Sequence, residues 1–354
     1  MNRAPVRRTA TVRAMLSFSC GHCGRLVFFE NFVCLSCGTP QGFVPERLRL
    51  VALEGEDASL HRCVNDDAAD CNWMVGAVDT LCRCCELTRT RPNDEDLDGM
   101  REFALAEAAK RRVIFQLLDL ELPGVRPGEL SFDLLSSAAQ PVTTGHADGV
   151  ITIDLAESDD ARREQRRQQL AEPYRTMLGH LRHELGHYFQ PLLVTGEQEW
   201  ERCRALFGDE RDDYDTALER HYERGTPSGW EERFVSAYAT MHPWEDWAET
   251  FAHYLHIRDT LQTAAEYGVT VRGPRAVTAD RSLKASPQPH AGARSFSELL
   301  ENWLPLTYAL NAVNRSMGRD DLYPFTLAPP VIDKLSFVHE RVQDAATGAP
   351  VPAR

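Results

Sequence analysis

Two histidines four residues apart, His183 and His187, enclose a glutamate that directly follows the first of them. Residues at positions i and i+4 of a helix share one face, so both imidazole rings can bind one metal ion. Glu184 would then lie beside a water molecule on that ion and could take up its proton. The segment from His183 to His187 therefore predicts a hydrolytic zinc site.

A second expected helix, which begins after Pro243, offers an acidic third ligand. Glu245 and Glu249 are also four residues apart, so they share a face of that helix. Tyr238 stands seven residues before Glu245, where its phenol could reach over the same metal ion. From the residues alone, both acids could instead be solvated, or either one could bind the metal while the other supports a ligand. Tyr238 could simply be a packing residue.

Two Cys-x-x-Cys pairs lie near the start of the chain, separated by ten residues: Cys20, Cys23, Cys34 and Cys37. Each pair aims two sulfur atoms at a point about 2.3 Å away, and two pairs complete a tetrahedral site with no open position. Apolar and aromatic residues at 26–32 predict the hairpin that returns the second pair to the metal ion. The pattern predicts a zinc ribbon; the alternatives are disulfides or accidental spacing.

A second group of cysteines follows with wider spacing: Cys63, Cys71, Cys82 and Cys85. Only the last two form a Cys-x-x-Cys pair, so buried cysteines without a metal ion remain an alternative to a second zinc site. Cys84 would be the spare thiol. Four thiolates leave no position for a reactive water molecule, so both cysteine groups are expected to bind structural zinc.

The distribution of cysteines favours a reducing compartment. Nine of the ten lie between Cys20 and Cys85. The chain has no apolar run of the roughly 18 to 20 residues that a bilayer span requires, and residues 1–16 lack the apolar stretch of a signal peptide. Crowded thiols in such a chain fit zinc better than disulfides, so we expect a cytoplasmic protein without membrane contact.

Charge disfavours nucleic acid as the partner of the whole protein. The 354 residues include 39 basic and 53 acidic side chains, which gives a net charge of -14. Such a charge opposes binding to phosphate backbones. Residues 1–62 carry eight arginines and five acids, a local net of +3, which leaves docking through the zinc ribbon open. We expect a protein or peptide as the main partner.

The spacing of the two acids behind the histidine motif resembles the gluzincin class of metallopeptidases. The element Glu245-x-x-Ala-Glu249 looks like that of the class, which implies Glu245 as the third zinc ligand and Glu249 as the acceptor that orients a histidine ring. With the two cysteine modules in front, segments 179–188 and 238–249 are similar to a bacterial family of zinc-binding metallopeptidases with an N-terminal zinc ribbon. The resemblance covers nearly the whole chain and implies one catalytic and two structural zinc ions.

Two parts are expected, separated by the polar segment 89–98. Residues 1–90 would form a zinc-binding region, with the ribbon at about 17–45 and the second cysteine site at about 60–88, and residues 95–354 a metallopeptidase-like domain. The predicted fold class is α+β: one or two small β units of the zinc-ribbon type, then a mostly helical gluzincin-like domain with a short β-sheet.

Hydrophobic periodicity places the elements of the second part. Helices are expected at about 98–118, 157–169, 173–189, 297–317 and 331–344, besides the one after Pro243. A strand expected at 149–155 would hold an extended substrate by backbone pairing. The segment 267–296, rich in Gly, Pro and Ser, is expected to be a lid, a flexible insertion or an unstructured loop.

Other metalloenzyme classes fit less well. Metzincins need Gly and His three and six positions after the second histidine, where this chain has Gln190 and Leu193. Iron oxygenases also use two histidines and a carboxylate, but Glu184 beside the first ligand suits hydrolysis better. We predict a zinc metallopeptidase that cleaves peptide or isopeptide bonds with Glu184 as general base. Two alternatives stay open: an inactive zinc-scaffolded adaptor that binds protein or nucleic acid, and a regulatory protein whose front end gates a peptidase.

Overall fold

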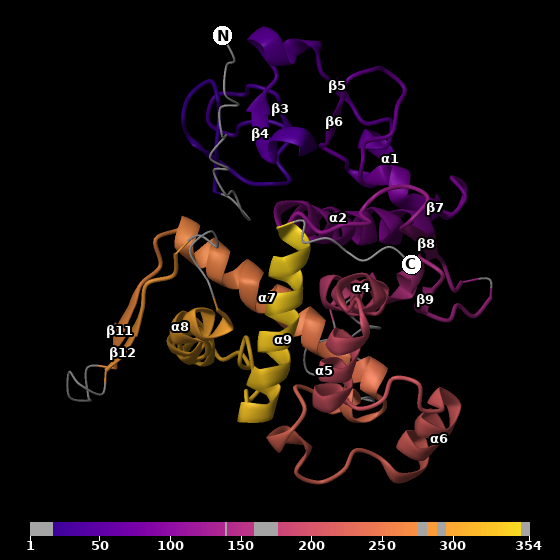
Figure 1. Cartoon of the computed structure of the whole chain (residues 1–354). Coiled ribbons are helices and arrows are strands. Elements are labelled where there is room, and N and C mark those ends of the chain that lie inside the picture. Colours follow the sequence, from indigo (N-terminus) through magenta and orange to yellow (C-terminus); the bar gives the residue numbers. More distant parts are fainter. Residues whose placement is uncertain (1–16, 139, 159–175, 275–281, 289–294, 348–354) are drawn as a thin grey trace, which may run out of the picture.

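A computed structural model describes residues 17–138, 140–158, 176–274, 282–288 and 295–347. Short strands dominate the first part and long helices the second, which confirms the α+β fold class (Figure 1). Most of the helix expected at 157–169, and the start of the one expected from 173, lie outside the described residues. Each described helix is too short or too polar to span a bilayer.

The cysteine-rich part is built from pairs of short antiparallel strands. The pairs are β1 (Phe18–Ser19) with β2 (Leu26–Val27), β3 (Gln41–Val44) with β4 (Arg49–Ala52), and β5 (His61–Arg62) with β6 (Met74–Val75). One-turn helices connect them: η1 (Pro45–Arg47), η2 (Gly55–Ser59), α1 (Asp66–Ala69) and η3 (Cys85–Leu87). Although the strands are short, side chains such as Phe43 and Leu50 are buried in the same core as residues of the helix that follows.

Helix α2 (Leu97–Asp119) joins this part to the rest of the molecule (Figure 1). The Phe115 ring on α2 packs against Phe29 of the cysteine-rich part, with ring centroids 5.4 Å apart. On another side of the helix, the Gln116 amide donates to the backbone oxygen of Leu255 at 2.7 Å. Helix α2 therefore contacts both the cysteine-rich part and the core of the helical part.

A four-stranded sheet lies beside α2, in the strand order β7 (Thr88–Thr90), β8 (Ser131–Leu135), β10 (Val150–Asp154) and β9 (Gly145–Ala147). The pairs β7–β8 and β8–β10 are parallel, and β10–β9 is antiparallel. Asp148 and Gly149, both with positive φ, form the two-residue turn between β9 and β10. Because β10 is paired on both sides, the strand predicted to hold substrate is an inner strand of the sheet; the edge strands are β7 and β9.

Six more long helices lie in the described part of the chain: α4 (Met177–Leu193), α5 (Glu197–Phe207), α6 (Tyr214–Arg224), α7 (Pro243–Glu266), α8 (Phe296–Ser316) and α9 (Pro329–Ala346). Polar side chains accept a hydrogen bond from the first turn of four of them: Thr176, Asp213, His242 and Ser295. Helix α9 lies beside α7, and α7 also packs on α4 (Figure 1).

Helices α4 and α7 approach each other closely at Gly186. A Cβ atom at this position would lie 2.7 Å from the Cα atom of Ala248 on α7. The Trp247 indole donates to the Gly186 backbone oxygen at 2.9 Å, and the rings of Phe189 and Phe251 stack with centroids 5.6 Å apart. Glycine therefore permits the contact that brings the histidine and glutamate motifs together.

Several elements differ from the sequence-based predictions. Helix α4 continues to Leu193 with Pro191 in its last turn, and the helix closes with a hydrogen bond from Val194 to the Gln190 oxygen at 2.9 Å. The expected loop at 267–296 contains a hairpin, β11 (Val271–Gly273) and β12 (Leu283–Ala285). Helices α5 and α6 were not predicted; each has only 11 residues, many of them charged, and buries few side chains.

Candidate metal centres and active site

Helices α4 and α7 bring three predicted zinc ligands together. His183 and His187 lie on successive turns of α4, and Glu245 lies in the first turn of α7. One donor atom from each residue lies within 4.8 Å of the other two. Glu245 Oε2 is 3.0 Å from His183 Nε2 and 3.3 Å from His187 Nε2. Three ligands of these types are typical of catalytic zinc, which keeps a further position for water.

Hydrogen bonding around these atoms indicates that they fit a cation. His183 Nδ1 donates to Glu249 Oε1 at 2.6 Å, so Nε2 carries the lone pair in the neutral ring. That lone pair faces Glu245 Oε2, an acceptor that receives no hydrogen bond from the described part of the chain. Buried acceptors that converge need a positive charge between them, and zinc accepts imidazole and carboxylate ligands.

Glu249 lies one turn after Glu245 and contacts the outer nitrogen of His183. Burial opposes ionisation of Glu249, but hydrogen bonds from His183 and Ser236 help lower its pKa to about 2. The carboxylate is therefore charged at neutral pH and holds one tautomer and one orientation of the His183 ring. This is the position predicted for a residue that supports a ligand.

Glu184, the predicted general base, contacts His180, a histidine of α4 that is not one of the predicted ligands. Glu184 Oε1 is 3.2 Å from Nε2 of His180, and Nδ1 of His180 is 2.5 Å from Oε2 of Glu157 on η4 (Leu155–Ser158). Burial opposes a charge on His180, but the two carboxylates raise its pKa to about 9. Burial also opposes ionisation of Glu184, whereas the neighbouring histidines lower its pKa.

Two tyrosines lie next to the three predicted ligands. Tyr238, on η6 (Tyr238–Thr240), has its ring centroid 5.9 Å from that of His183. Tyr214 donates from its hydroxyl to Glu245 Oε1 at 2.9 Å and also interacts with Tyr238. Burial and the Glu245 charge raise the pKa of Tyr214, so its hydroxyl stays protonated. The two oxygens of Glu245 thus have different partners.

Sequence reasoning missed Tyr214 and the role of His180. The spacing of His180 and Glu184, one helical turn, was a signal that could have revealed their contact. Tyr214 and Glu157 offered no such signal, because α6 and η4 bring them to the site from distant parts of the chain.

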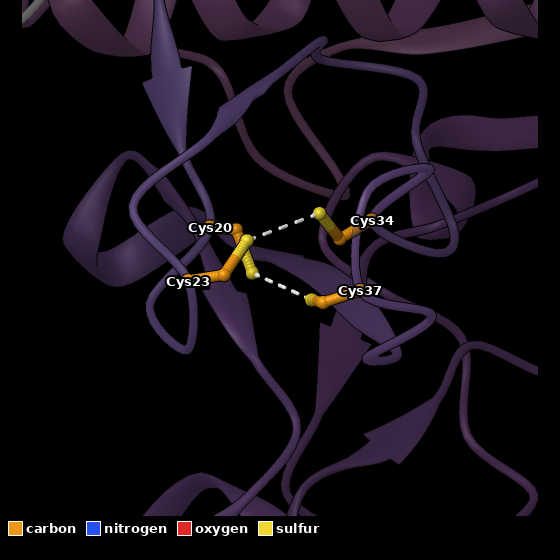
Figure 2. Close-up of side chains that lie close together, drawn as sticks. All are labelled: Cys20, Cys23, Cys34 and Cys37. Atoms are coloured by element: carbon orange, nitrogen blue, oxygen red, sulfur yellow. Dashed lines mark hydrogen bonds between the residues drawn. The ribbon is translucent and has the colours of Figure 1, made fainter.

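Four sulfur atoms converge in the first cysteine group (Figure 2). Cys20 Sγ lies 3.8 Å from Cys37 Sγ, and Cys23 Sγ lies 3.7 Å from Cys34 Sγ. A disulfide would need about 2.05 Å. Sulfur atoms placed tetrahedrally at about 2.3 Å from zinc are about 3.8 Å apart, so the spacing fits a zinc site.

The second cysteine group is buried more deeply, and its four sulfur atoms also lie within 4.8 Å of one another. Its members are Cys63, Cys71, Cys82 and Cys85. The Sγ atom of Cys71 is 3.7 Å from those of Cys82 and Cys85, again close to the edge of a zinc tetrahedron. Cys84 is outside this group, and complete burial raises the pKa of its thiol.

Helix α2 places three charged side chains beside the second cysteine group. Lys110 and Glu107 are fully buried and form an ion pair at 2.5 Å. Arg111 donates to the backbone oxygen of Asp70 at 3.0 Å, while its Nη1 atom makes no hydrogen bond within the described residues. Burial would lower the pKa of Arg111, but the neighbouring cysteines and Glu107 keep it raised. Arg111 therefore places a positive charge beside the sulfur atoms.

Comparison with known families accounts for most of the chain. A family described as "Putative zinc-binding metallo-peptidase" matches residues 99–341, and a zinc-ribbon domain matches residues 17–96. The chain belongs to this metallopeptidase family. The match confirms the resemblance inferred from the histidine, glutamate and cysteine motifs, and the family and both cysteine groups support zinc as the metal.

Relatives of the chain occur in mycobacteria. Proteins of Mycobacterium bovis (strain ATCC BAA-935 / AF2122/97) and Mycobacterium tuberculosis (strains CDC 1551 / Oshkosh and ATCC 25618 / H37Rv) are each 49% identical to the chain over 340 residues. The alignments cover 94% of this chain and 96% of each relative, and all three carry the name "Uncharacterized protein". No solved structure matches the chain.

Proposed function

We propose that this protein is a zinc-dependent peptidase that hydrolyses peptide or isopeptide bonds. The proposal assigns His183, His187 and Glu245 as the ligands of one zinc ion, Glu249 as the support of His183, and Glu184 as the general base. The observation that carries it is the convergence of two imidazole nitrogens and a carboxylate oxygen within 4.8 Å, with Glu184 next to the first histidine. Membership of the metallopeptidase family supports the same reaction class.

The proposed reaction needs few side chains. Zinc in this site would polarise the substrate carbonyl and lower the pKa of a water molecule to about 7. Glu184 accepts a proton from the attacking water and then gives it to the leaving amine, so that the C–N bond breaks. The products are a carboxylic acid and an amine, which exchange a proton to become a carboxylate and an ammonium ion. Tyr238 donates a hydrogen bond to the carbonyl oxygen as negative charge develops there.

Strand β9 is the proposed support for the substrate backbone. It is one of the two edge strands of the four-stranded sheet, and it lies against α4, the helix with the histidine motif. An extended peptide can add to such an edge by main-chain hydrogen bonds. This arrangement suits a protein or peptide substrate of varied sequence, because backbone groups are common to all peptides.

The two cysteine groups are proposed to bind structural zinc, which gives three zinc ions per chain. Their eight thiols must stay reduced to bind metal, so we place the protein in the cytoplasm. The zinc ribbon is a candidate docking surface for the protein substrate. Nucleic acid and membranes have no part in this proposal.

Cleavage of a peptide library by the purified protein tests the proposal. We expect cleavage that a zinc chelator abolishes and added zinc restores. Glu184→Gln should keep three zinc ions by elemental analysis and lose turnover by about 100-fold or more, because the proton acceptor is gone. His183→Ala should instead lower the zinc content from three to two.

Other outcomes would contradict the proposal. Unchanged turnover in Glu184→Gln would remove this residue from its role. Retention of three zinc ions in His183→Ala would reject the ligand assignment. A metal-loaded protein that binds peptides but cleaves none of them would favour the zinc-scaffolded adaptor.

A further inference from the structure

A chain of three buried side chains ends on the proposed general base. Glu157 on η4 contacts Nδ1 of His180, and Nε2 of His180 contacts Oε1 of Glu184. The exposed fractions of the three side chains are only 4%, 14% and 6%, in that order. The imidazole ring is therefore held at both nitrogens, between two carboxylates that come from different elements.

The order of these contacts gives the histidine a definite orientation. His180 lies one turn before Glu184 on α4, so the helix alone brings the two side chains onto one face. Glu157 follows strand β10 and reaches the ring from outside the helix. Its second oxygen lies 3.5 Å from the hydroxyl of Thr144. Glu157 is thus fixed by the sheet and in turn fixes the ring.

We propose that His180, held by Glu157, is a positioning residue that fixes the Glu184 carboxylate for proton transfer. The inference rests on the proposed function and deepens it. His180 binds one oxygen of the carboxylate and leaves the other for the attacking water. A general base must lie within about 3.2 Å of the oxygen whose proton it accepts, and small displacements cost large factors in rate.

The same contact prevents a competing arrangement. A carboxylate on the helix that carries the zinc ligands could rotate toward the ion and bind it, because zinc accepts carboxylate oxygens. Such a rotation would occupy the position that water needs. The hydrogen bond from His180 holds Glu184 away from this arrangement.

Two substitutions at position 180 separate positioning from packing. His180→Phe keeps a planar ring but removes both hydrogen bonds. His180→Gln places an amide donor near the position of Nε2 and so keeps the bond to Glu184. The matched control is Tyr308→Phe, at an exposed tyrosine of α8 that belongs to none of the proposed sites.

The first readout needs no substrate. Cobalt(II) replaces zinc at the histidine site of the full chain, with two zinc ions retained, and the visible spectrum is titrated with pH. In Glu184→Gln the midpoint should shift by about 0.5 pH unit or more, because a charge beside the solvent ligand is lost. His180→Phe should also shift the midpoint, whereas His180→Gln and Tyr308→Phe should match the wild type.

The second readout is peptide hydrolysis. His180→Phe should lower kcat by about 10- to 100-fold with KM changed less than about twofold, and His180→Gln should recover most of the loss. Equal midpoints for wild type and Glu184→Gln would overturn the proposed function and this inference with it. A shifted midpoint in Glu184→Gln but wild-type behaviour of His180→Phe in both readouts would overturn the positioning role alone.

Discussion

The two carboxylate oxygens of Glu245 have different partners, and this difference sets how the residue can bind zinc. Oε2 faces both histidine rings, whereas Oε1 accepts a hydrogen bond from Tyr214 at 2.9 Å. A carboxylate held in this way presents one oxygen to the metal ion and cannot turn freely. Tyr214 therefore belongs to the site although it does not touch the proposed metal position.

Removal of the Tyr214 hydroxyl should weaken zinc binding. Tyr214→Phe keeps the ring and loses only the bond to Glu245, so we expect about 10-fold to 100-fold lower affinity for one zinc ion of the three. Competition with a chelator of known affinity measures the change. Tyr222→Phe, on the exposed face of the same helix, is the matched control and should bind zinc like the wild type. Equal affinities for both variants would show that the Tyr214 contact is dispensable.

At the scale of elements, the crossing of α4 and α7 determines whether the ligands meet. Gly186→Ala should destabilise the protein, because the added Cβ would lie 2.7 Å from the backbone of Ala248. Overpacking of this kind costs about 1 to 3 kcal/mol, which offsets the gain of up to about 1 kcal/mol in helix propensity. The helices must also separate, so the affinity for the catalytic zinc should fall.

Chemical denaturation and zinc competition together check this expectation. Gly76→Ala is the matched control, because nothing lies within 4 Å of a Cβ atom there. A Gly186→Ala variant with wild-type stability and zinc affinity would mean that the two helices can move apart without consequence.

The contact between α7 and α9 contains a histidine that should make the protein sensitive to acid. Burial lowers the pKa of His339 to about 4, and its Nδ1 atom lies 3.2 Å from the hydroxyl of Tyr254. The unfolded chain binds a proton at this residue near pH 6.5, whereas the folded chain does so only near pH 4. Stability is therefore lost as pH falls from about 6.5 to about 4.

Replacement by asparagine removes this proton without removing the polar contact. Between pH 7 and pH 5, the free energy of unfolding of His339→Asn should fall by about 1 to 2 kcal/mol less than that of the wild type. Urea denaturation at both pH values measures the difference. The same pH dependence in wild type and His339→Asn would assign the acid sensitivity to other groups.

At the scale of the whole molecule, the sequence predicted what local spacing determines. The histidine pair of α4 and the paired cysteines have fixed spacings, so their convergence could be anticipated from helix and knuckle geometry. The edge position of β9 could not, because it depends on which strand pairs with β8. Tyr214 and Glu157 were missed for the same reason: each reaches the site through tertiary packing and not through a local pattern.

The second cysteine group connects metal binding to the stability of the helical part. Lys110 and Arg111 are buried on α2 beside the thiolates, and the same helix bonds to α7 through Gln116. Without zinc and its four thiolates, Arg111 would be a buried cation with too little negative charge around it. Because structural zinc contributes about 10 to 16 kcal/mol in small domains, loss of this ion should affect the molecule well beyond the cysteine-rich part.

Neighbouring cysteines allow a direct test of this connection. Cys85→Ala should lose one zinc ion by elemental analysis, lower the melting temperature by about 10 °C or more, and raise hydrogen exchange in α2. Cys84→Ala should keep three zinc ions and melt within a few degrees of the wild type, because this buried thiol lies outside the cluster. Cys85→Ala could instead lose zinc while α2 stays protected from hydrogen exchange. The cysteine-rich part would then be a separate unit, and the charged side chains of α2 would not connect zinc binding to the stability of the helical part.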